Sequence, residues 1–167
     1  FINNTACDRG GAIQFEDNEN ATIKCSRFIN NSAGTEGGAI DFYTGAKNGK
    51  IIDSNFTNNT AQENAGAIFW KGYNGIINGS RFEANKAIGL GDGRLLSTTD
   101  NPKIAGTQTE KRYNITGGDG GAIKWIGSDA IIENTTFYRN NATYNGGAIY
   151  LVRPSATENC TNITFTT

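Results

Sequence analysis

One short motif recurs along the whole chain and constrains its fold more than any other feature. The motif is Gly-Gly-Ala-Ile or a close variant, and its five copies begin at Gly10, Gly37, Ala65, Gly120 and Gly146. Successive copies are 27, 28, 55 and 26 residues apart. A period of about 20 to 50 residues is typical of solenoids, in which each repeat forms one coil that packs on its neighbours. The step of 55 residues therefore predicts one coil interrupted by an insertion.

A phenylalanine motif repeats in phase with the first. Each copy has Asn three residues and Ala five residues after the Phe, and the copies begin at Phe1, Phe28, Phe56, Phe82 and Phe137. The glycine block begins nine positions after this Phe in four copies, whereas Gly120 lies 38 positions after Phe82, which predicts an insertion of 29 residues. Later copies also have an aliphatic residue five positions before the Phe. Phe165 is expected to begin a sixth copy, with Cys160 in the aliphatic place.

Alternating polarity after the glycines predicts short strands with one buried face. Ile13 and Phe15 would lie on one face of such a strand and Gln14 on the other. The equivalent inward pairs are Ile40/Phe42, Ile68/Trp70, Ile123/Trp125 and Ile149/Leu151. The position between them varies in type, as expected of a solvent-facing site, and is occupied by Gln14, Asp41, Phe69, Lys124 and Tyr150.

These repeats predict an all-β fold. Coils stacked ~4.8 Å apart would align equivalent side chains in columns, and a single coil could not bury its inner face alone. We therefore expect a right-handed parallel β-helix, or solenoid, of about five to six coils, with three short strands per coil and one long insertion loop. Residues 1–167 are expected to form a single β-helix segment of a longer array, and residues 88–118 the insertion within it.

The asparagine three residues after each Phe is expected to have a structural role. Asn adopts the left-handed conformation more readily than most residues, so it suits a bend. Its amide could also bond to the equivalent amide in the coils above and below. The predicted ladder consists of Asn4, Asn31, Asn59, Asn85 and Asn140.

Composition excludes several classes of protein. The chain has no His, which excludes Ser-His-Asp triads and the usual catalytic zinc sites. Its 15 basic and 16 acidic residues are dispersed, so it has no basic footprint for nucleic acid, and it lacks an apolar run of the ~20 residues that would span a bilayer. Cys7, Cys25 and Cys160 are too few for a disulfide framework. Cys7 and Cys25 occupy different repeat positions and are expected to be reduced.

Together, the Phe-x-x-Asn and Gly-Gly-Ala-Ile motifs resemble the repeats of chlamydial polymorphic outer membrane proteins and of the adhesin-like surface proteins of methanogenic archaea. The resemblance covers nearly the whole chain outside the insertion. It implies a right-handed parallel β-helix used as a passenger or stalk in attachment to cells or surfaces. The same architecture serves enzymes and scaffolds, so the resemblance specifies the fold more closely than the function.

A carbohydrate-active enzyme would need a cluster of carboxylates, which in a solenoid would lie at equivalent positions of adjacent coils. The corner before the second glycine has Glu36, Asn64, Asp119 and Asn145, with no two acids in adjacent coils. We therefore predict no catalytic, cofactor-binding or metal-binding residues. A calcium ion at Asp119 remains an alternative to simple selection of Asp by a turn.

The insertion is the part that the repeat does not explain. Long loops are usually functional or disordered, so residues 88–118 are either a tolerated excursion or a partner-binding lobe. The candidate partner-binding residues are Asp92, Arg94, Lys103, Lys111, Arg112 and Tyr113.

Asn-x-Ser/Thr sequons occur throughout the chain and would allow N-glycosylation of a secreted protein. The sequon asparagines are Asn3, Asn20, Asn30, Asn55, Asn58, Asn78, Asn114, Asn134, Asn141, Asn159 and Asn162. The preferred candidates are Asn78, beside a turn glycine, and Asn114, in the insertion.

Three functions are consistent with this sequence. The first is a non-enzymatic, extracellular adhesin-like or stalk segment at the cell surface, which would contact other surface proteins or glycans, pack against coils of the same parent chain or associate end to end. The second is a carbohydrate-active β-helix enzyme of the lyase or glycosidase type. The third is a self-assembling filament or sheath segment, because a coil stack exposes strand edges at its ends. We expect neither nucleic-acid binding nor membrane insertion.

Overall fold

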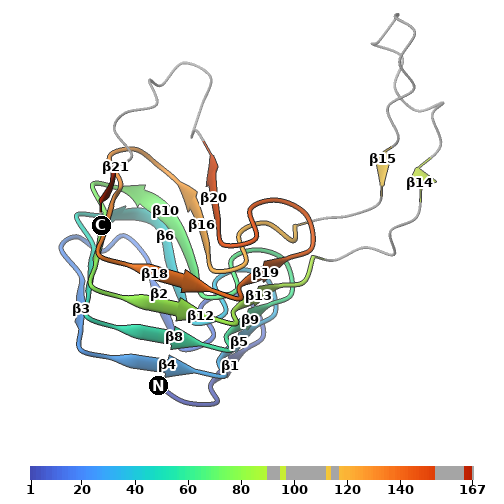
Figure 1. The fold of residues 1–167 in the computed structure, drawn as a ribbon, viewed down its shortest axis with the longest axis horizontal. Coiled ribbons are helices and arrows are strands. Elements are labelled where there is room, and N and C mark those ends of the chain that lie inside the picture. The colour runs from blue at the N-terminus through green and yellow to red at the C-terminus, as the bar shows by residue number, and fades with distance from the viewer. Residues whose placement is uncertain (90–94, 97–111, 114–116, 153–163, 167) are drawn as a thin grey trace, which may run out of the picture.

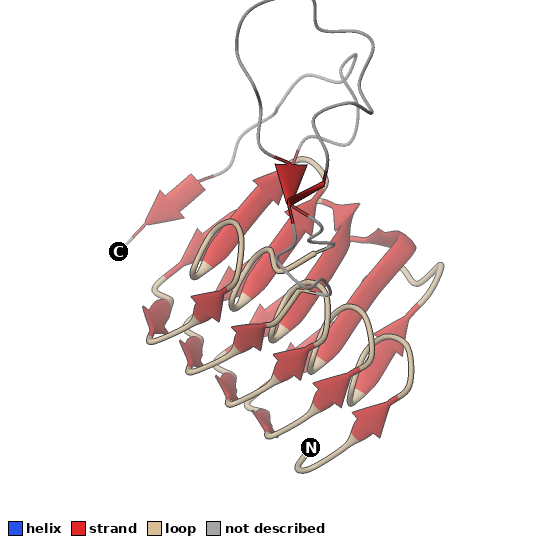
Figure 2. Ribbon diagram, turned by 90° about the vertical axis from the view of Figure 1, so that its right-hand side faces the viewer, coloured by secondary structure: helices blue, strands red, loops and turns tan. Residues whose placement is uncertain are grey.

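The computed structural model describes residues 1–89, 95–96, 112–113, 117–152 and 164–166. Every regular element in these ranges is a β-strand. The strands wind as a right-handed parallel β-helix in which successive coils stack in register (Figures 1 and 2). The described ranges contain no helix with the length and hydropathy needed to cross a membrane.

Four parallel sheets run along the stack, and we name each by the repeat residue that it contains. The Phe sheet consists of β4 (Arg27–Ile29), β8 (Asn55–Thr57), β12 (Arg81–Glu83) and β18 (Thr136–Tyr138). The Ala sheet consists of β1 (Thr5–Ala6), β5 (Ser32–Ala33), β9 (Thr60–Ala61), β13 (Lys86–Ala87) and β19 (Asn141–Ala142). The Ala-Ile sheet consists of β2 (Ile13–Phe15), β6 (Ile40–Lys47), β10 (Ile68–Tyr73), β16 (Ile123–Ile126) and β20 (Ile149–Val152). The aliphatic sheet consists of β3 (Thr22–Lys24), β7 (Lys50–Ile52), β11 (Ile76–Asn78), β17 (Ile131–Glu133) and β21 (Thr164–Thr166).

A complete coil therefore has four strands, whereas the sequence predicts three. The additional strand is the two-residue strand of the Ala sheet, such as β5 or β9. A corner separates it from the Phe strand of the same coil. Asn30 and Asn58 form this corner with left-handed φ angles of 54°.

The position of the left-handed residue also differs from the prediction. It lies two residues after the Phe, whereas the motif predicts it three residues after, at Asn31 and Asn59. Ala84 occupies this corner in the fourth coil with φ 53°, and Arg139 occupies it in the fifth with φ 54°. The corner therefore accepts residues other than Asn.

The core is a set of side-chain columns that run through the coils. The Phe column stacks ring on ring, with centroids 4.7 Å apart for Phe1 and Phe28 and 4.8 Å apart for Phe28 and Phe56. Trp70 and Trp125 stack in the Ala-Ile sheet with centroids 4.3 Å apart. The predicted inward pairs of the three middle coils are buried, namely Ile40/Phe42, Ile68/Trp70 and Ile123/Trp125.

The outward position of the Ala-Ile sheet is less exposed than predicted. Asp41 has no exposed surface and Phe69 is 3% exposed, whereas Gln14 in the first coil is exposed. Gln14, Asp41 and Phe69 are aligned in adjacent strands. The charged side chains of Arg9 and Glu36, from the corner loops, lie near Asp41. The alternation of the strand alone therefore does not determine which side chains of this face are exposed.

The last described strand corrects the predicted sixth copy. Phe165 pairs with Ile132 in the aliphatic sheet, so it does not begin a new Phe column. Cys160, which the repeat predicts in the aliphatic place, lies outside the described residues.

Candidate functional site

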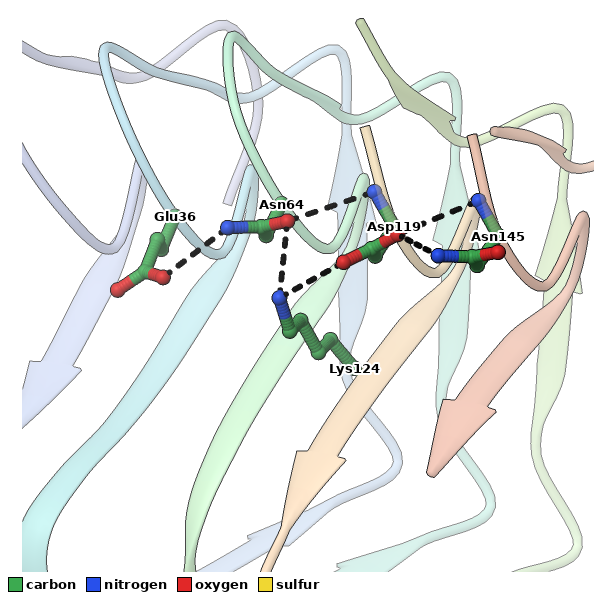
Figure 3. Close-up of polar contacts among 5 residues, drawn as sticks. All are labelled: Glu36, Asn64, Asp119, Lys124 and Asn145. Carbon is green, nitrogen blue, oxygen red and sulfur yellow. Dashed lines mark hydrogen bonds and ion pairs between the residues drawn. The ribbon is translucent and has the colours of Figure 1, made fainter. Parts of the chain in front are cut away.

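A polar column follows the corner between the Ala sheet and the Ala-Ile sheet. We call it the corner column, and it consists of Arg9, Glu36, Asn64, Asp119 and Asn145, one from each coil. Figure 3 shows its last four members. Asn64 Nδ2 donates to Glu36 Oε1 at 3.2 Å. Asn145 Nδ2 donates to Asp119 Oδ1 at 2.8 Å. Amide and carboxylate groups thus connect adjacent coils at this corner.

Lys124 joins the two halves of the corner column from the outward face of β16 (Figure 3). Its Nζ lies 3.0 Å from Asp119 Oδ2 and 3.1 Å from Asn64 Oδ1. The Lys124 and Asp119 side chains are only 13% and 12% exposed, which favours a strong ion pair because solvent screens it little. An ammonium group therefore lies directly beside the Asp119 carboxylate.

A second set of charged side chains, including Arg9 and Glu36, lies around Asp41, one coil before Asn64. The Asp41 oxygens are buried and have no hydrogen-bond partner among the described residues. Burial raises the pKa of Asp41 to about 7, with a further increase from the nearby Glu36 carboxylate and an opposing effect from Arg9. A protonated Asp41 relieves the cost of a buried charge at this position.

Arg9 connects this group to the outer surface. Its Nε lies 3.4 Å from Glu36 Oε2, and its guanidinium lies over the Tyr43 ring at 4.2 Å from the centroid. Lys71 Nζ is 5.2 Å from the same centroid. The hydrogen bond and positive charge of Arg9 lower the pKa of the Tyr43 phenol. Two cations and one aromatic ring therefore meet at this part of the surface.

The sequence does not predict that Arg9, Glu36 and Asp41 lie together. Arg9 and Glu36 occupy the same corner position in adjacent coils with opposite charges, and this could have indicated the ion pair. The burial of Asp41 has no such signal, because its strand pattern is that of an exposed residue.

The insertion leaves the stack at the corner column. Ile88 N donates to Ala61 O at 3.0 Å, and the chain returns at Gly118, whose carbonyl accepts from Tyr144 N at 2.8 Å. Gly89 and Gly118 lie so close that a Cβ added to Gly89 would be 3.1 Å from Gly118 Cα. Both glycines have positive φ, 74° and 83°. The two ends of the insertion are therefore fixed side by side.

Part of the insertion is described as an antiparallel pair. β14 (Leu95–Leu96) pairs with β15 (Arg112–Tyr113), and Tyr113 is aligned with Leu95. These two predicted partner-binding residues, Arg112 and Tyr113, thus lie on a strand. The other four predicted residues, Asp92, Arg94, Lys103 and Lys111, lie outside the described residues.

The five asparagines three residues after Phe form a hydrogen-bonded ladder along the stack. Asn31 Nδ2 donates to Asn59 Oδ1 at 2.9 Å, and Asn59 Nδ2 donates to Asn85 Oδ1 at 2.9 Å. Asn4 and Asn140 extend the ladder at its two ends with bonds of the same length. Asn31, Asn59 and Asn85 are buried. The ladder satisfies backbone groups within the corner, so its amides are not available to a ligand.

The structure describes one of the two preferred glycosylation candidates, Asn78. Asn78 is half-buried, donates to Glu133 Oε2 at 3.2 Å and accepts from Asn134 Nδ2 at 3.2 Å. Asn114 lies outside the described residues. Cys7 and Cys25 are both exposed and form no disulfide with one another.

The region around Asp41 combines a buried carboxylate with accessible cationic and aromatic groups. The described residues contain no cluster of three or more Cys, Asp or Glu that could hold a metal ion. Asp41 and Glu36 are neighbouring carboxylates, but Asp41 has no exposed surface with which to contact a substrate. The accessible groups of this region are cationic and aromatic, namely Arg9, Tyr43 and Lys71.

Comparison with known proteins identifies the repeat. The family model of the Chlamydia polymorphic membrane protein repeat matches residues 1–16, 26–42, 53–69 and 134–151. The match does not include the fourth coil, in which the insertion separates the two halves of the motif. Phe82 and Ile123 of this coil still occupy the same columns as their equivalents. No curated protein and no solved structure matches the chain. Four of the five coils of this parallel β-helix thus contain repeats similar to those of the Chlamydia polymorphic membrane proteins, which point to a surface-exposed, adhesin-like protein family.

Proposed function

We propose that this chain is a non-enzymatic, extracellular display segment of a cell-surface protein, in which the coils form a stalk and the insertion contacts the partner. One observation supports this proposal above the others. The side chains that recur in the middle coils, namely the Phe, the Ile and the ladder Asn, are all used inside the stack. The repeat therefore builds the scaffold, and residues 88–118 are the main departure from it.

The attachment of the insertion supports a display role. Rigid scaffolds commonly present binding residues on loops. Gly89 and Gly118 fix the two ends of this loop beside Asp119, which is itself held by Lys124 and Asn145. Asp92, Arg94, Lys103, Lys111, Arg112 and Tyr113 provide both charges and an aromatic ring, which suits a surface protein or a glycan as partner.

Deletion of residues 89–117 tests this proposal. The deletion leaves Ile88, Gly118 and Asp119 between Ala87 and Gly120, which is the three-residue spacing of the other corner loops. Beads coated with the intact chain should bind members of a panel of fixed cells and printed glycans, and beads coated with the deletion variant should not. Circular dichroism should show the same β-structure for both. Equal binding by the two chains would refute the role of the insertion.

A carbohydrate-active enzyme is a second candidate, favoured only by the neighbouring carboxylates of Asp41 and Glu36. Incubation of the chain with pectic, uronic and neutral polysaccharides, followed by assays of reducing ends and of unsaturated products, tests it. We expect no product. Product formation that is lost in both Asp41→Asn and Glu36→Gln variants would contradict the non-enzymatic proposal.

A further inference from the structure

Three asparagines at the corner between the Phe sheet and the Ala sheet share one setting. Asn3, Asn30 and Asn58 occupy the left-handed corner in the first three coils, with φ angles of 58°, 54° and 54°. All three are exposed, and their side chains make no hydrogen bond to any described residue. Their amides thus have no partner among the described residues, in contrast to the hydrogen-bonded amides of the ladder residues that follow them.

Each of these asparagines begins an Asn-x-Ser/Thr sequon. The hydroxyl residues are Thr5, Ser32 and Thr60, aligned at the starts of β1, β5 and β9. Thr5 is exposed, and Ser32 and Thr60 are half-buried. None of the three hydroxyls donates a hydrogen bond to another described side chain or carbonyl, so the described part of the fold does not use them.

The fourth and fifth coils show that the fold requires neither sequon residue. Ala84 replaces the corner Asn in the fourth coil, and Lys86 stands in the hydroxyl position. Arg139 and Asn141 occupy the same two positions in the fifth coil. The Asn and the hydroxyl are therefore present together in three coils and absent together in two. Selection of Asn for its backbone preference alone would not couple the two positions.

We propose that Asn3, Asn30 and Asn58 are N-glycosylation sites. The donor would be an oligosaccharide linked to a polyisoprenyl diphosphate, used by a membrane oligosaccharyltransferase. In this transfer the amide nitrogen of Asn bonds to C1 of the first sugar, the C1–O bond to the diphosphate breaks, and the amide loses one proton. The lipid diphosphate is the leaving group. A free, exposed amide can accept this group without loss of any contact in the coil.

Four other sequons in the described residues fit a glycan less well. Asn78 and Asn134 are hydrogen-bonded to one another at 3.2 Å, and Asn20 Oδ1 accepts from Asn48 at 3.2 Å. Asn55 lies within β8 between Arg27 and Arg81 of the adjacent strands. A glycan at these positions would displace a neighbour or lie across the sheet.

The three glycans would form a continuous band. Coils are 4.7 to 4.8 Å apart at the Phe rings beside this corner, so the three acceptors follow one line along the N-terminal coils. The insertion leaves from the opposite end of the Ala strand, after Ala87. Glycans in the band would therefore cover a corner that the insertion does not share.

Site mapping in a glycosylating host tests the proposal. The intact chain would be secreted from a eukaryotic cell line with a C-terminal tag that carries one Asn-Gly-Thr sequon as an internal control. Peptide mass spectrometry with and without N-glycosidase would report occupancy. We expect glycans on the tag and on Asn3, Asn30 and Asn58, with Asn78 and Asn134 unmodified. A modified tag with the three corner residues unmodified would overturn the proposal.

Two variants make the test specific. Ser32→Ala removes the hydroxyl but leaves the Asn30 corner intact, so the mass should fall by one glycan and only Asn30 should become unmodified. The double substitution Ala84→Asn, Lys86→Thr installs the same sequon in the fourth coil and should add one glycan at position 84. Failure of this gain, with folding confirmed by circular dichroism, would show that the corner is not a glycan acceptor.

Discussion

At the scale of single residues, adjacent asparagines have different roles in this fold. In the second coil Asn30 forms the exposed left-handed corner, whereas Asn31 is buried and bonded to Asn59 of the next coil. Both types recur in the sequence, so the pattern alone does not indicate which one turns the chain. The distinction depends on the path of the backbone after the Phe strand.

Asn59→Ala should destabilise the stack much more than Asn58→Ala. Asn59 is fully buried, accepts from Asn31 N at 3.0 Å and donates to Phe28 O at 3.0 Å. Its loss leaves two or more buried groups unsatisfied, at a cost of about 3 kcal/mol in the free energy of unfolding. Asn58→Ala should cost about 1 kcal/mol, because a left-handed Ala is already tolerated at Ala84.

Urea denaturation followed by circular dichroism measures both effects. Bacterially expressed protein is suitable, since it lacks glycans that could alter the Asn58 comparison. Equal losses from the two substitutions would contradict the structural role of the ladder.

The stability of the chain should depend on pH through Asp41. Its pKa is about 7 in the folded chain, against an ordinary value of 3.8 when the carboxyl is solvated in the unfolded chain, so the folded state binds the extra proton between these values. This contribution is fully present below pH ~4 and is lost as the pH rises through 7, at a cost of at most about 4 kcal/mol. Asp41→Asn resembles the protonated form and should remove this dependence.

Denaturation midpoints at pH 5, 7 and 9 compare the two chains. The wild type should lose stability at pH 9 relative to pH 5, and Asp41→Asn should be the more stable chain at pH 9. A wild-type midpoint that does not fall between pH 5 and pH 9 relative to that of Asp41→Asn would show that Asp41 is not protonated at pH 5 in the folded chain.

At the scale of elements, coil stacking depends on close backbone approach at the glycine turns. A Cβ on Gly38 would be 2.1 Å from Gly66 O of the next coil and 2.6 Å from Thr60 O. The φ angle of Gly38 is not in the left-handed region, so space rather than backbone conformation requires this glycine. The preceding Gly37, with φ 65°, serves the turn itself.

Gly38→Ala should therefore disrupt the contact between β6 and β10, and Gly147→Ala should not. Among the described residues, the nearest atom to a Cβ on Gly147 is Asn140 O at 3.8 Å, which is an ordinary contact. We expect a loss of several kcal/mol or failure to fold for Gly38→Ala, and a change within about 0.5 kcal/mol for Gly147→Ala. Soluble yield and urea midpoint measure both, and similar behaviour of the two variants would contradict the stacking geometry.

The elements differ in how far the sequence predicts them. The inward pairs such as Ile68 and Trp70 follow from strand alternation, and the structure confirms their burial. The four-strand coil does not follow from the sequence, because a two-residue strand such as β5 has no periodicity of its own. The burial of Asp41 escapes prediction because it depends on contacts between adjacent coils rather than on its own strand.

At the scale of the whole molecule, the corner loops occupy equivalent positions along one scaffold. Each joins an Ala strand to a glycine turn at the corner column, and one of them contains the insertion. Asp119 and Lys124 form an ion pair at the corner that follows this insertion, and Arg9 and Glu36 form another in the first two coils. Under the proposed function, the coils provide the stability of the scaffold and the one extended loop provides recognition.

Transfer of the insertion between corners tests the central claim most directly. Residues 89–117 would be removed from the fourth coil and inserted after Gly34, in the corner loop of the second coil. Attachment of coated beads to the fixed-cell and glycan panel would be measured for the intact, deleted and transferred chains. We predict that the deletion abolishes binding and the transfer restores it to the same targets. Binding that persists in the deleted chain, or does not return in a folded transferred chain, would contradict the assignment of recognition to this loop.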